Sequence, residues 1–170
     1  TKKGELKQTL ERGALYAAPR LLGCRLIIQS TPESLIESII SETEAYTSDD
    51  PASHTFRGKT KRNASMFLPA GHAYLYRSYG IHICFNIVTG KRDVGEAVLI
   101  RSVIPVSGTD LMIKNRNWDG KPIKQLANGP GKVCQALGLN SGFDGTDLLR
   151  KNQFRLEPAL APSTQEVYAT

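Results

Sequence analysis

The sequence predicts an α+β fold, with a single domain built on a curved, largely antiparallel β-sheet core flanked by helices. Strand-like segments come early in the chain and mostly follow one another, whereas helical patterns lie at both ends. This order is typical of an antiparallel sheet and differs from the strand–helix alternation of βαβ folds. A chain of 170 residues, 40% of them hydrophobic, can bury one core. We therefore expect residues 1–170 to form one domain.

The N-terminal part is predicted to be helical. Leu6, Leu10 and Leu15 recur near helical spacing, which indicates an amphipathic helix over residues 5–15. Pro19 is expected to begin a second, short helix that runs through Leu22 and ends at Gly23.

A β-hairpin is predicted next. Residues 24–29 and 35–42 are rich in β-branched and apolar side chains, and a turn at 30–33 separates them. We expect these two strands to pair with each other.

The middle of the chain combines a long loop with three strands. Residues 47–65 are polar and have few apolar anchors, and loops of this length in compact domains are usually functional. Strands are predicted over 73–78, 82–89 and 97–103, with a turn at 90–93 between the last two.

The C-terminal part is predicted to be mainly helical. Residues 109–115 and 121–126 have helical patterns, and a Gly-Pro-Gly segment precedes a third helix over 132–137. A late, short strand is expected at 154–157.

Charge and composition restrict the classes of partner and site. The net charge of +6 and the pI of about 9.3 favour an anionic partner. The three cysteines and three histidines are dispersed, which argues against a disulfide framework, a zinc site or any other metal centre. We expect small buried cysteines in a reducing compartment, and no cofactor. No signal peptide and no membrane-spanning apolar run is recognised.

Two carboxylates at the end of the second predicted strand form the first candidate site. Glu42 and Glu44 are two residues apart, so on a strand they can share a face with Cα atoms roughly 6.5–7 Å apart. A carboxylate in a partly desolvated pocket can activate water. The same pattern is also typical of a solvated strand end. Tyr46 follows directly.

The long loop carries the densest basic cluster. Arg57, Lys59, Lys61 and Arg62 lie within six residues of one another, and His54 precedes them. Such a cluster can neutralise several phosphates, although it is also typical of a solvated charged loop. A second candidate phosphate contact lies at 128–132, where free backbone N–H groups at a helix start favour an anion.

A tyrosine cluster completes the candidate site. Tyr74 and Tyr76 are expected on one face of their strand, and Tyr79 lies beside Gly80 at the strand end. An exposed ring there can wedge into a base stack, and an inward ring can stack on an extruded base for roughly 1–3 kcal/mol. Ordinary packing in a β-sheet core is the alternative interpretation.

Together these segments resemble the alkyladenine (3-methyladenine) DNA glycosylase family, from about residue 13 to 160. The Glu-Thr-Glu-Ala-Tyr motif at 42–46, His54 with the basic loop after it, and the aromatic segments that follow match the family in order and spacing. The other matching segments are 66–67, Gly71, 74–76, 79–80, 84–86, 97–101 and 129–137.

The resemblance implies a monofunctional N-glycosylase that removes damaged purines and needs no cofactor. Glu44 would be the catalytic base that activates water for attack at C1′, and Arg101 would orient the water or a phosphate. The flipped base would be enclosed by Tyr46 and His54, with Tyr76 stacking on its other side. Asn86 would disfavour guanine, Ala45 would belong to the base pocket, and Tyr79 would be the wedge. The implied DNA-phosphate contacts are Arg57, Lys59, Thr60, Arg62 and Lys132.

The resemblance also implies how the chain acts. We expect a monomer that binds double-stranded DNA containing alkylated or deaminated purines, with no membrane, inside the cell (bacterial cytoplasm or eukaryotic nucleus). A charged base is already a good leaving group, so Glu44 alone can suffice and Glu42 becomes a structural carboxylate. The alternatives are a non-catalytic nucleic-acid-binding domain and a small-molecule nucleoside hydrolase. Glu44 argues against the first, and the basic loop and Tyr79 argue against the second.

The sequence departs from the family pattern in three places. Arg77-Ser78 replaces a more apolar pair before the predicted wedge, and His82 and Ile83 stand where aromatic residues are frequent. A final strand and an aromatic segment of the family are absent after Thr170, so we expect the C-terminal end of the domain to be incomplete.

Overall fold

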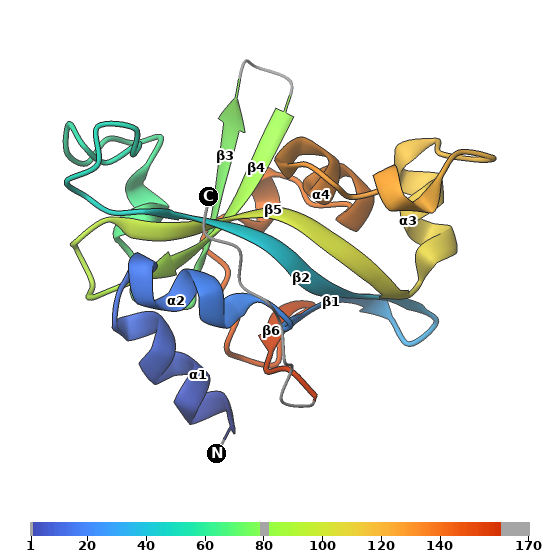
Figure 1. The fold of residues 1–170 in the computed structure, drawn as a ribbon, viewed down its shortest axis with the longest axis horizontal. Coiled ribbons are helices and arrows are strands. Elements are labelled where there is room, and N and C mark those ends of the chain that lie inside the picture. The colour runs from blue at the N-terminus through green and yellow to red at the C-terminus, as the bar shows by residue number, and fades with distance from the viewer. Residues whose placement is uncertain (1, 79–81, 161–170) are drawn as a thin grey trace.

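The fold is organised around one six-stranded sheet with the strand order β3-β4-β5-β2-β1-β6 (Figure 1). The structure is a computed structural model that describes residues 2–78 and 82–160. All neighbouring strands run antiparallel. The strands are β1 Arg25–Thr31, β2 Ser34–Tyr46, β3 Ala73–Ser78, β4 His82–Thr89, β5 Glu96–Ser107 and β6 Phe154–Glu157. This confirms the predicted α+β fold with a largely antiparallel sheet.

Helices lie on both sides of the long β2–β5 pair in the view of Figure 1, with α1 and α2 below it and α3 and α4 above it. The helices of the described part are α1 Lys2–Glu11, α2 Ala14–Leu21, α3 Thr109–Arg116 and α4 Pro130–Leu137, with short 3₁₀ helices η1 Ala64–Phe67, η2 Ile123–Gln125 and η3 Ser141–Phe143. Among these described residues, no helix is both long and apolar enough to cross a membrane.

The predicted N-terminal helix is in fact two helices that meet at Gly13. Gly13 has φ 102° and ψ 168°, a conformation outside the helical region that glycine adopts without steric cost. A Cβ at this position would lie 3.0 Å from Glu96 Oε2. Contrary to the prediction, Pro19 lies inside α2 and does not begin a helix.

The predicted helix over 121–126 is also wrong, because only the 3₁₀ turn η2 forms there. Pro122 has extended backbone angles, and the Arg116 guanidinium donates to the carbonyls of Gln125 and Leu126 at 3.0 and 2.8 Å. These carbonyl groups are thus bonded to a side chain and not to a continuing helix.

The main core consists of buried residues of the sheet and of the helices α1, α2, α3 and α4. Alternate residues of the central strands, such as Phe85, Ile87, Val98 and Ile100, point into it and are fully buried. Phe154 of β6 contacts Phe85 with ring centroids 5.0 Å apart. The other face of β3, β4, β5 and β2 is therefore available for the site.

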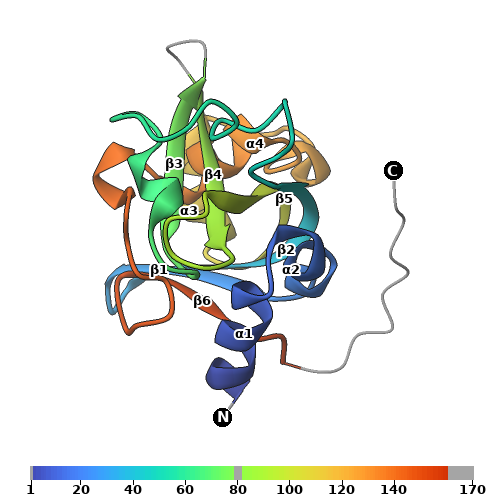
Figure 2. The ribbon, with the colours of Figure 1, turned by 90° about the vertical axis from the view of Figure 1, so that its left-hand side faces the viewer.

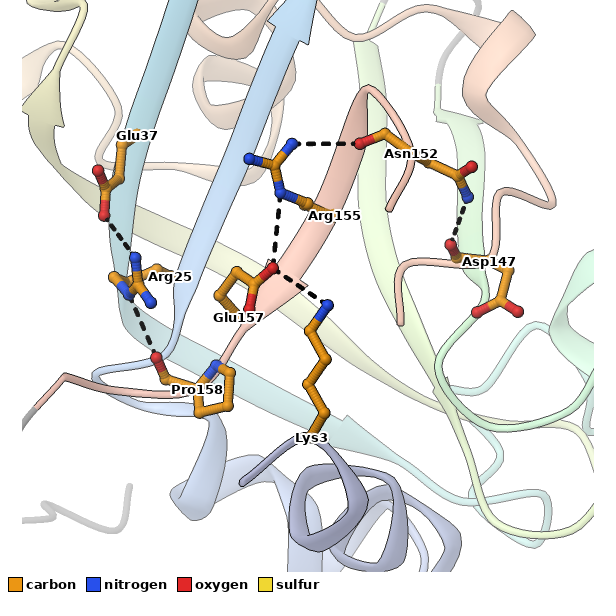
Figure 3. Close-up of polar contacts among 8 residues, drawn as sticks. All are labelled: Lys3, Arg25, Glu37, Asp147, Asn152, Arg155, Glu157 and Pro158. Atoms are coloured by element: carbon orange, nitrogen blue, oxygen red, sulfur yellow. Dashed lines mark hydrogen bonds and ion pairs between the residues drawn. The ribbon is translucent and has the colours of Figure 1, made fainter. Parts of the chain in front are cut away.

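Ion pairs fasten the sheet edge formed by β6, β1 and β2 (Figure 3). Lys3 of α1 and Arg155 of β6 both lie near Glu157, at 3.3 and 3.5 Å, and Arg25 of β1 pairs with Glu37 of β2 at 3.0 Å. The Arg25 side chain also donates to the Pro158 carbonyl at 3.2 Å. This network joins the N-terminal helix to the last described strand.

Candidate active site

One row of paired residues crosses four strands and defines the site. Tyr74 of β3 pairs with Asn86 of β4, Asn86 pairs with Leu99 of β5, and Leu99 pairs with Glu44 of β2. Directly opposed residues of antiparallel strands present their side chains on the same face. The row therefore brings an aromatic ring, an amide and a carboxylate to one side of the sheet.

A cavity of about 180 Å³ lies over this row. The segment between β2 and η1 covers it, and Figure 2 shows this segment beside β3 and β4. The cavity is lined by Tyr46, Ala52, His54, Met66, Tyr74, Tyr76, Cys84, Asn86 and Leu99. Its walls are mainly aromatic and apolar, with Asn86 and His54 as polar groups, which is the composition of a site for a flat, weakly polar ring.

The carboxylate of Glu44 is held on both oxygens at the side of this cavity. Arg101 Nη1 donates to Oε2 at 2.9 Å, and the Tyr46 hydroxyl donates to Oε1. The side chains of Arg101 and Glu44 remain 43% and 40% exposed. Glu44 adjoins the cavity through its neighbours Tyr46 and Leu99, both of which line it. A carboxylate placed in this way can act on a group at the mouth of the cavity.

A β-bulge in β5 directs Arg101 to this carboxylate. Glu42 pairs with Ser102 and Thr43 pairs with Ile100, so Arg101 between them has no partner on β2. This is a β-bulge, which redirects side chains and is frequent next to active sites. Ile100 and Val103, three residues apart, both reach the main core as a result.

Burial and hydrogen bonding keep the Tyr46 hydroxyl protonated. Burial, the hydrogen bond to Glu44 and the Glu44 charge raise the pKa of Tyr46 to about 12. Burial also raises the pKa of Tyr74. Both hydroxyl groups are therefore hydrogen-bond donors at neutral pH.

His54 forms an aromatic wall together with Tyr76. Their ring centroids are 3.9 Å apart with an interplanar angle of 36°, and His54 Nδ1 lies 3.1 Å from the Tyr74 hydroxyl. Burial, and next the charge of Arg62, lower the pKa of His54. Arg62 itself lies over the Tyr76 ring, with its guanidinium carbon 5.1 Å from the centroid. His54 and Arg62 thus both contact the Tyr76 ring.

The start of α4 lies against the start of β4. A Cβ at Gly131 would lie 3.1 Å from His82 Nδ1, so glycine permits this close approach. Lys132 in the first turn of α4 donates from Nζ to Asn128 Oδ1 at 2.9 Å. Because His82 begins β4, this helix start lies at the N-terminal end of that strand.

Comparison with known proteins decides the family. The family model described as "Methylpurine-DNA glycosylase (MPG)" matches residues 8–170. Similar proteins include one from Methanoculleus marisnigri, 51% identical over 138 residues (81% of this chain, 70% of the relative), and one from Chlamydia pneumoniae, 47% identical over 165 residues (95% and 79%). A third, from Carboxydothermus hydrogenoformans, is 46% identical over 142 residues (84% and 73%). Each carries the name "Putative 3-methyladenine DNA glycosylase".

The chain belongs to the methylpurine-DNA glycosylase family. It is a base-excision repair DNA glycosylase, a hydrolase that acts on alkylpurines, and its substrate is DNA. This confirms the resemblance found in the sequence and favours an enzyme of DNA over the two alternative functions.

The glycosylase structure brings most of the predicted site residues together. Glu44, Tyr46 and Arg101 contact one another directly, and Tyr46, His54, Tyr76 and Asn86 line the same cavity. The predicted phosphate contacts Arg57, Lys59, Thr60 and Arg62 are exposed on the loop that covers the cavity. Glu42 is exposed, and the described residues show no hydrogen bond or ion pair to its side chain.

Two predictions on the base pocket need correction, and one on the wedge falls outside the described residues. Ala45 is predicted in the pocket, but its side chain packs against the main core, because it alternates with Glu44 and Tyr46 along β2. His54 and Tyr76 contact each other, so a base has no space between these two rings in this structure. The predicted wedge, Tyr79, lies outside the described residues.

The sequence did not reveal several residues of the glycosylase site. Cys84 is predicted to be a small buried cysteine, but it is only half-buried and lines the cavity beside Tyr76, its partner on β3. Burial raises the pKa of its thiol. Met66 lies almost completely buried in the cavity wall. Cys84 could have been found from strand alternation, because it shares a face with Asn86 two residues later.

Proposed function

We propose that this glycosylase removes alkylated and deaminated purines, 3-methyladenine among them, from double-stranded DNA after base flipping, with Glu44 as the catalytic base. One observation carries the proposal: the Glu44 carboxylate is fixed by Arg101 and Tyr46 at the side of an aromatic cavity. A base in the cavity would place its sugar near this carboxylate. Enzymes that act on a base in a duplex must extrude it, at a cost of a few kcal/mol that is lower for damaged pairs.

The chemistry assigned to Glu44 is general-base catalysis. The carboxylate accepts a proton from water while the water oxygen forms a bond to C1′. The electron pair of the C1′–N9 bond leaves with the base. An alkylated, positively charged purine becomes neutral as it accepts this pair, so no general acid is required. Arg101 and Tyr46 orient the carboxylate during this step.

The cavity suits an electron-poor purine. We assign one wall to Tyr46 and the other to the stacked rings of His54 and Tyr76, which supports stacking and cation–π attraction to a charged base. The lowered pKa of His54 keeps its imidazole uncharged near neutral pH, so it does not repel a cationic base. Asn86, which donates from Nδ2 to the Tyr74 carbonyl at 3.3 Å, is the group that disfavours the exocyclic amine of guanine.

The duplex would be bound on both sides of the cavity mouth. Arg57, Lys59, Thr60 and Arg62 are assigned to phosphates on the loop side, and Lys132 at the α4 start is assigned to the other side. Tyr79 is the proposed wedge that fills the gap left by the flipped base. The enzyme is expected to act as a monomer, inside the cell in the compartment that holds the DNA.

Base release from a panel of single-lesion duplexes tests the proposal, with Glu44→Gln as the critical variant. Loss of a general base lowers the rate by about 10²–10⁴-fold, whereas duplex binding should persist. Glu42→Gln is the matched control, because Glu42 is an exposed carboxylate two residues away. Its excision rate should stay within about two-fold of wild type. Near wild-type excision by Glu44→Gln would disprove the assigned mechanism.

A further inference from the structure

Asn63 is a buried amide that lies outside the cavity but is bonded to its wall. The residue is 3% exposed. The Nδ2 group donates to the His54 carbonyl at 2.9 Å and to the Gly58 carbonyl at 3.0 Å, and Oδ1 accepts the Thr60 N–H at 2.6 Å. One amide therefore joins the cavity wall at His54 to the basic loop at Gly58 and Thr60.

The backbone of Asn63 extends the same connection to a second cavity residue. The Met66 N–H donates to the Asn63 carbonyl at 2.9 Å, at the start of η1. His54 and Met66 both line the cavity, so both are hydrogen-bonded to a residue that does not. The preceding residue, Arg62, covers the Tyr76 ring and donates from Nη2 to the Arg77 carbonyl at 3.2 Å.

The chemistry of the position matches asparagine in particular. An asparagine side chain supplies two N–H donors and one carbonyl acceptor, and here both donors and the acceptor are used. Alanine would remove these three part-buried hydrogen bonds, each of which is worth about 0.5–1.5 kcal/mol. An ionised aspartate would keep the acceptor but would place a negative oxygen against the two carbonyls.

We propose that Asn63 is a positioning residue for base recognition: it sets the His54 wall of the base pocket and couples that wall to the phosphate-contacting loop. This inference rests on the proposed function, in which His54 faces the flipped base and the loop contacts DNA. Binding of the loop to phosphates would be transmitted to the wall through Gly58, Thr60 and the shared amide.

The proposal predicts a selective kinetic defect. A wall displaced by about 1 Å misplaces the base relative to Glu44 and can reduce the rate of a chemical step by about ten- to hundred-fold. Cationic bases leave readily, so their excision should depend less on the wall than excision of slowly released bases. Asn63→Ala should therefore lower the maximal rate for the slowest lesion that wild type excises, and lower it less for 7-methylguanine.

Single-turnover base release with enzyme in excess measures this effect. The maximal rate at saturating enzyme does not depend on the folded fraction, so a purely structural loss leaves both maximal rates, and their ratio, unchanged. Asn152→Ala is the matched control. It removes a comparable side-chain hydrogen bond, which Asn152 Nδ2 donates to the Asp147 carbonyl at 2.7 Å in a part-buried place near β6. We expect wild-type rates and a wild-type ratio from it.

A second variant keeps the test decisive if Asn63→Ala does not fold. Asn63→Asp keeps the acceptor for Thr60, and its carboxyl group gains one O–H donor when protonated. Its defect relative to wild type should shrink as the pH falls. A pH-independent defect, or wild-type maximal rates in both variants while Glu44→Gln is inactive, overturns the proposal for Asn63 alone. Base release by Glu44→Gln instead overturns the proposed function on which it rests.

Discussion

Arg101 Nη1 lies 2.9 Å from Glu44 Oε2. A second arginine–glutamate pair of nearly the same length, 3.0 Å, joins Arg25 of β1 to Glu37, which lies on β2 as Glu44 does. Strand β2 thus supplies both carboxylates, one at the cavity and one on the sheet edge that carries the ion-pair network. The two pairs have the same chemistry and differ in surroundings, so each serves as a control for the other.

Arg101→Ala should impair catalysis much more than stability. The pair is partly exposed, and exposed ion pairs contribute about 0–1 kcal/mol to the free energy of unfolding. Loss of the group that orients Glu44 should lower the single-turnover excision rate by about 100-fold. Chemical denaturation and base release measure the two effects. Arg25→Ala should leave excision unchanged, and an equal catalytic loss in both variants would contradict a special role for Arg101.

Tyr46→Phe should separate the two functions of the ring. The variant keeps the aromatic wall but removes the donor to Glu44 Oε1, and a hydrogen bond to a charged group is worth about 1.5–3 kcal/mol. Excision should fall about 10–100-fold, whereas affinity for a lesion duplex should change little. Tyr46→Ala should lose affinity as well. If Tyr46→Phe excises at the wild-type rate, the hydroxyl has no part in holding Glu44.

Removal of basic side chains from the loop should weaken the salt dependence of DNA binding. The plot of log K against log salt has a negative slope, and each phosphate that is no longer neutralised should reduce the magnitude of this slope by about 0.9. Arg57→Ala and Lys59→Ala, singly and combined, should therefore reduce the slope stepwise in a fluorescence anisotropy titration. Lys7→Ala is the control, because Lys7 lies on α1 and not on the loop. Its ammonium group pairs with Glu11 at 3.9 Å. An unchanged slope in the double variant would exclude these two residues from the interface.

His54 should make the folded state less stable in acid. Burial, and next Arg62, lower the pKa of His54 below its usual 6.5, so the unfolded chain takes up the proton first as the pH falls. The free energy of unfolding should decrease from pH 6.5 down to the folded-state pKa. Denaturant unfolding of wild type and His54→Gln between pH 5 and 8 gives the difference curve, in which other ionisable groups cancel. A flat difference curve would show that the protein does not perturb this histidine.

The strand positions were largely predictable because local patterns determine them. The predicted limits of β3, β4 and β6 agree with the structure, since each is a compact apolar run between turn residues. β2 extends to Tyr46, four residues past its predicted end, because pairing with β5 up to Ala97 stabilises a polar stretch that has no apolar pattern of its own. The polar residues beyond the predicted end of β2 include Glu44 and Tyr46 of the candidate site.

Side-chain placement at the site was only partly predictable, because it depends on long-range pairing. The roles of Glu44, Tyr46 and His54 came from family motifs. The bulge that directs Arg101 depends on the register between β2 and β5, which no local pattern specifies. Asn63 belonged to the basic loop that matches the family, but no role could be assigned to it, since its partners become apparent only in the folded loop.

The row from Tyr74 through Asn86 and Leu99 to Glu44 has a consequence for how lesion range can change. Adjacent strands are about 4.8 Å apart, so the sheet spaces the four side chains at regular intervals. Each of the four residues lies on a different strand. If the proposed roles hold, we expect an exchange at Asn86 or Leu99 to alter which base is accepted, because both face the cavity, while Glu44 keeps its place on β2. A change of substrate would then not require a change in the catalytic step.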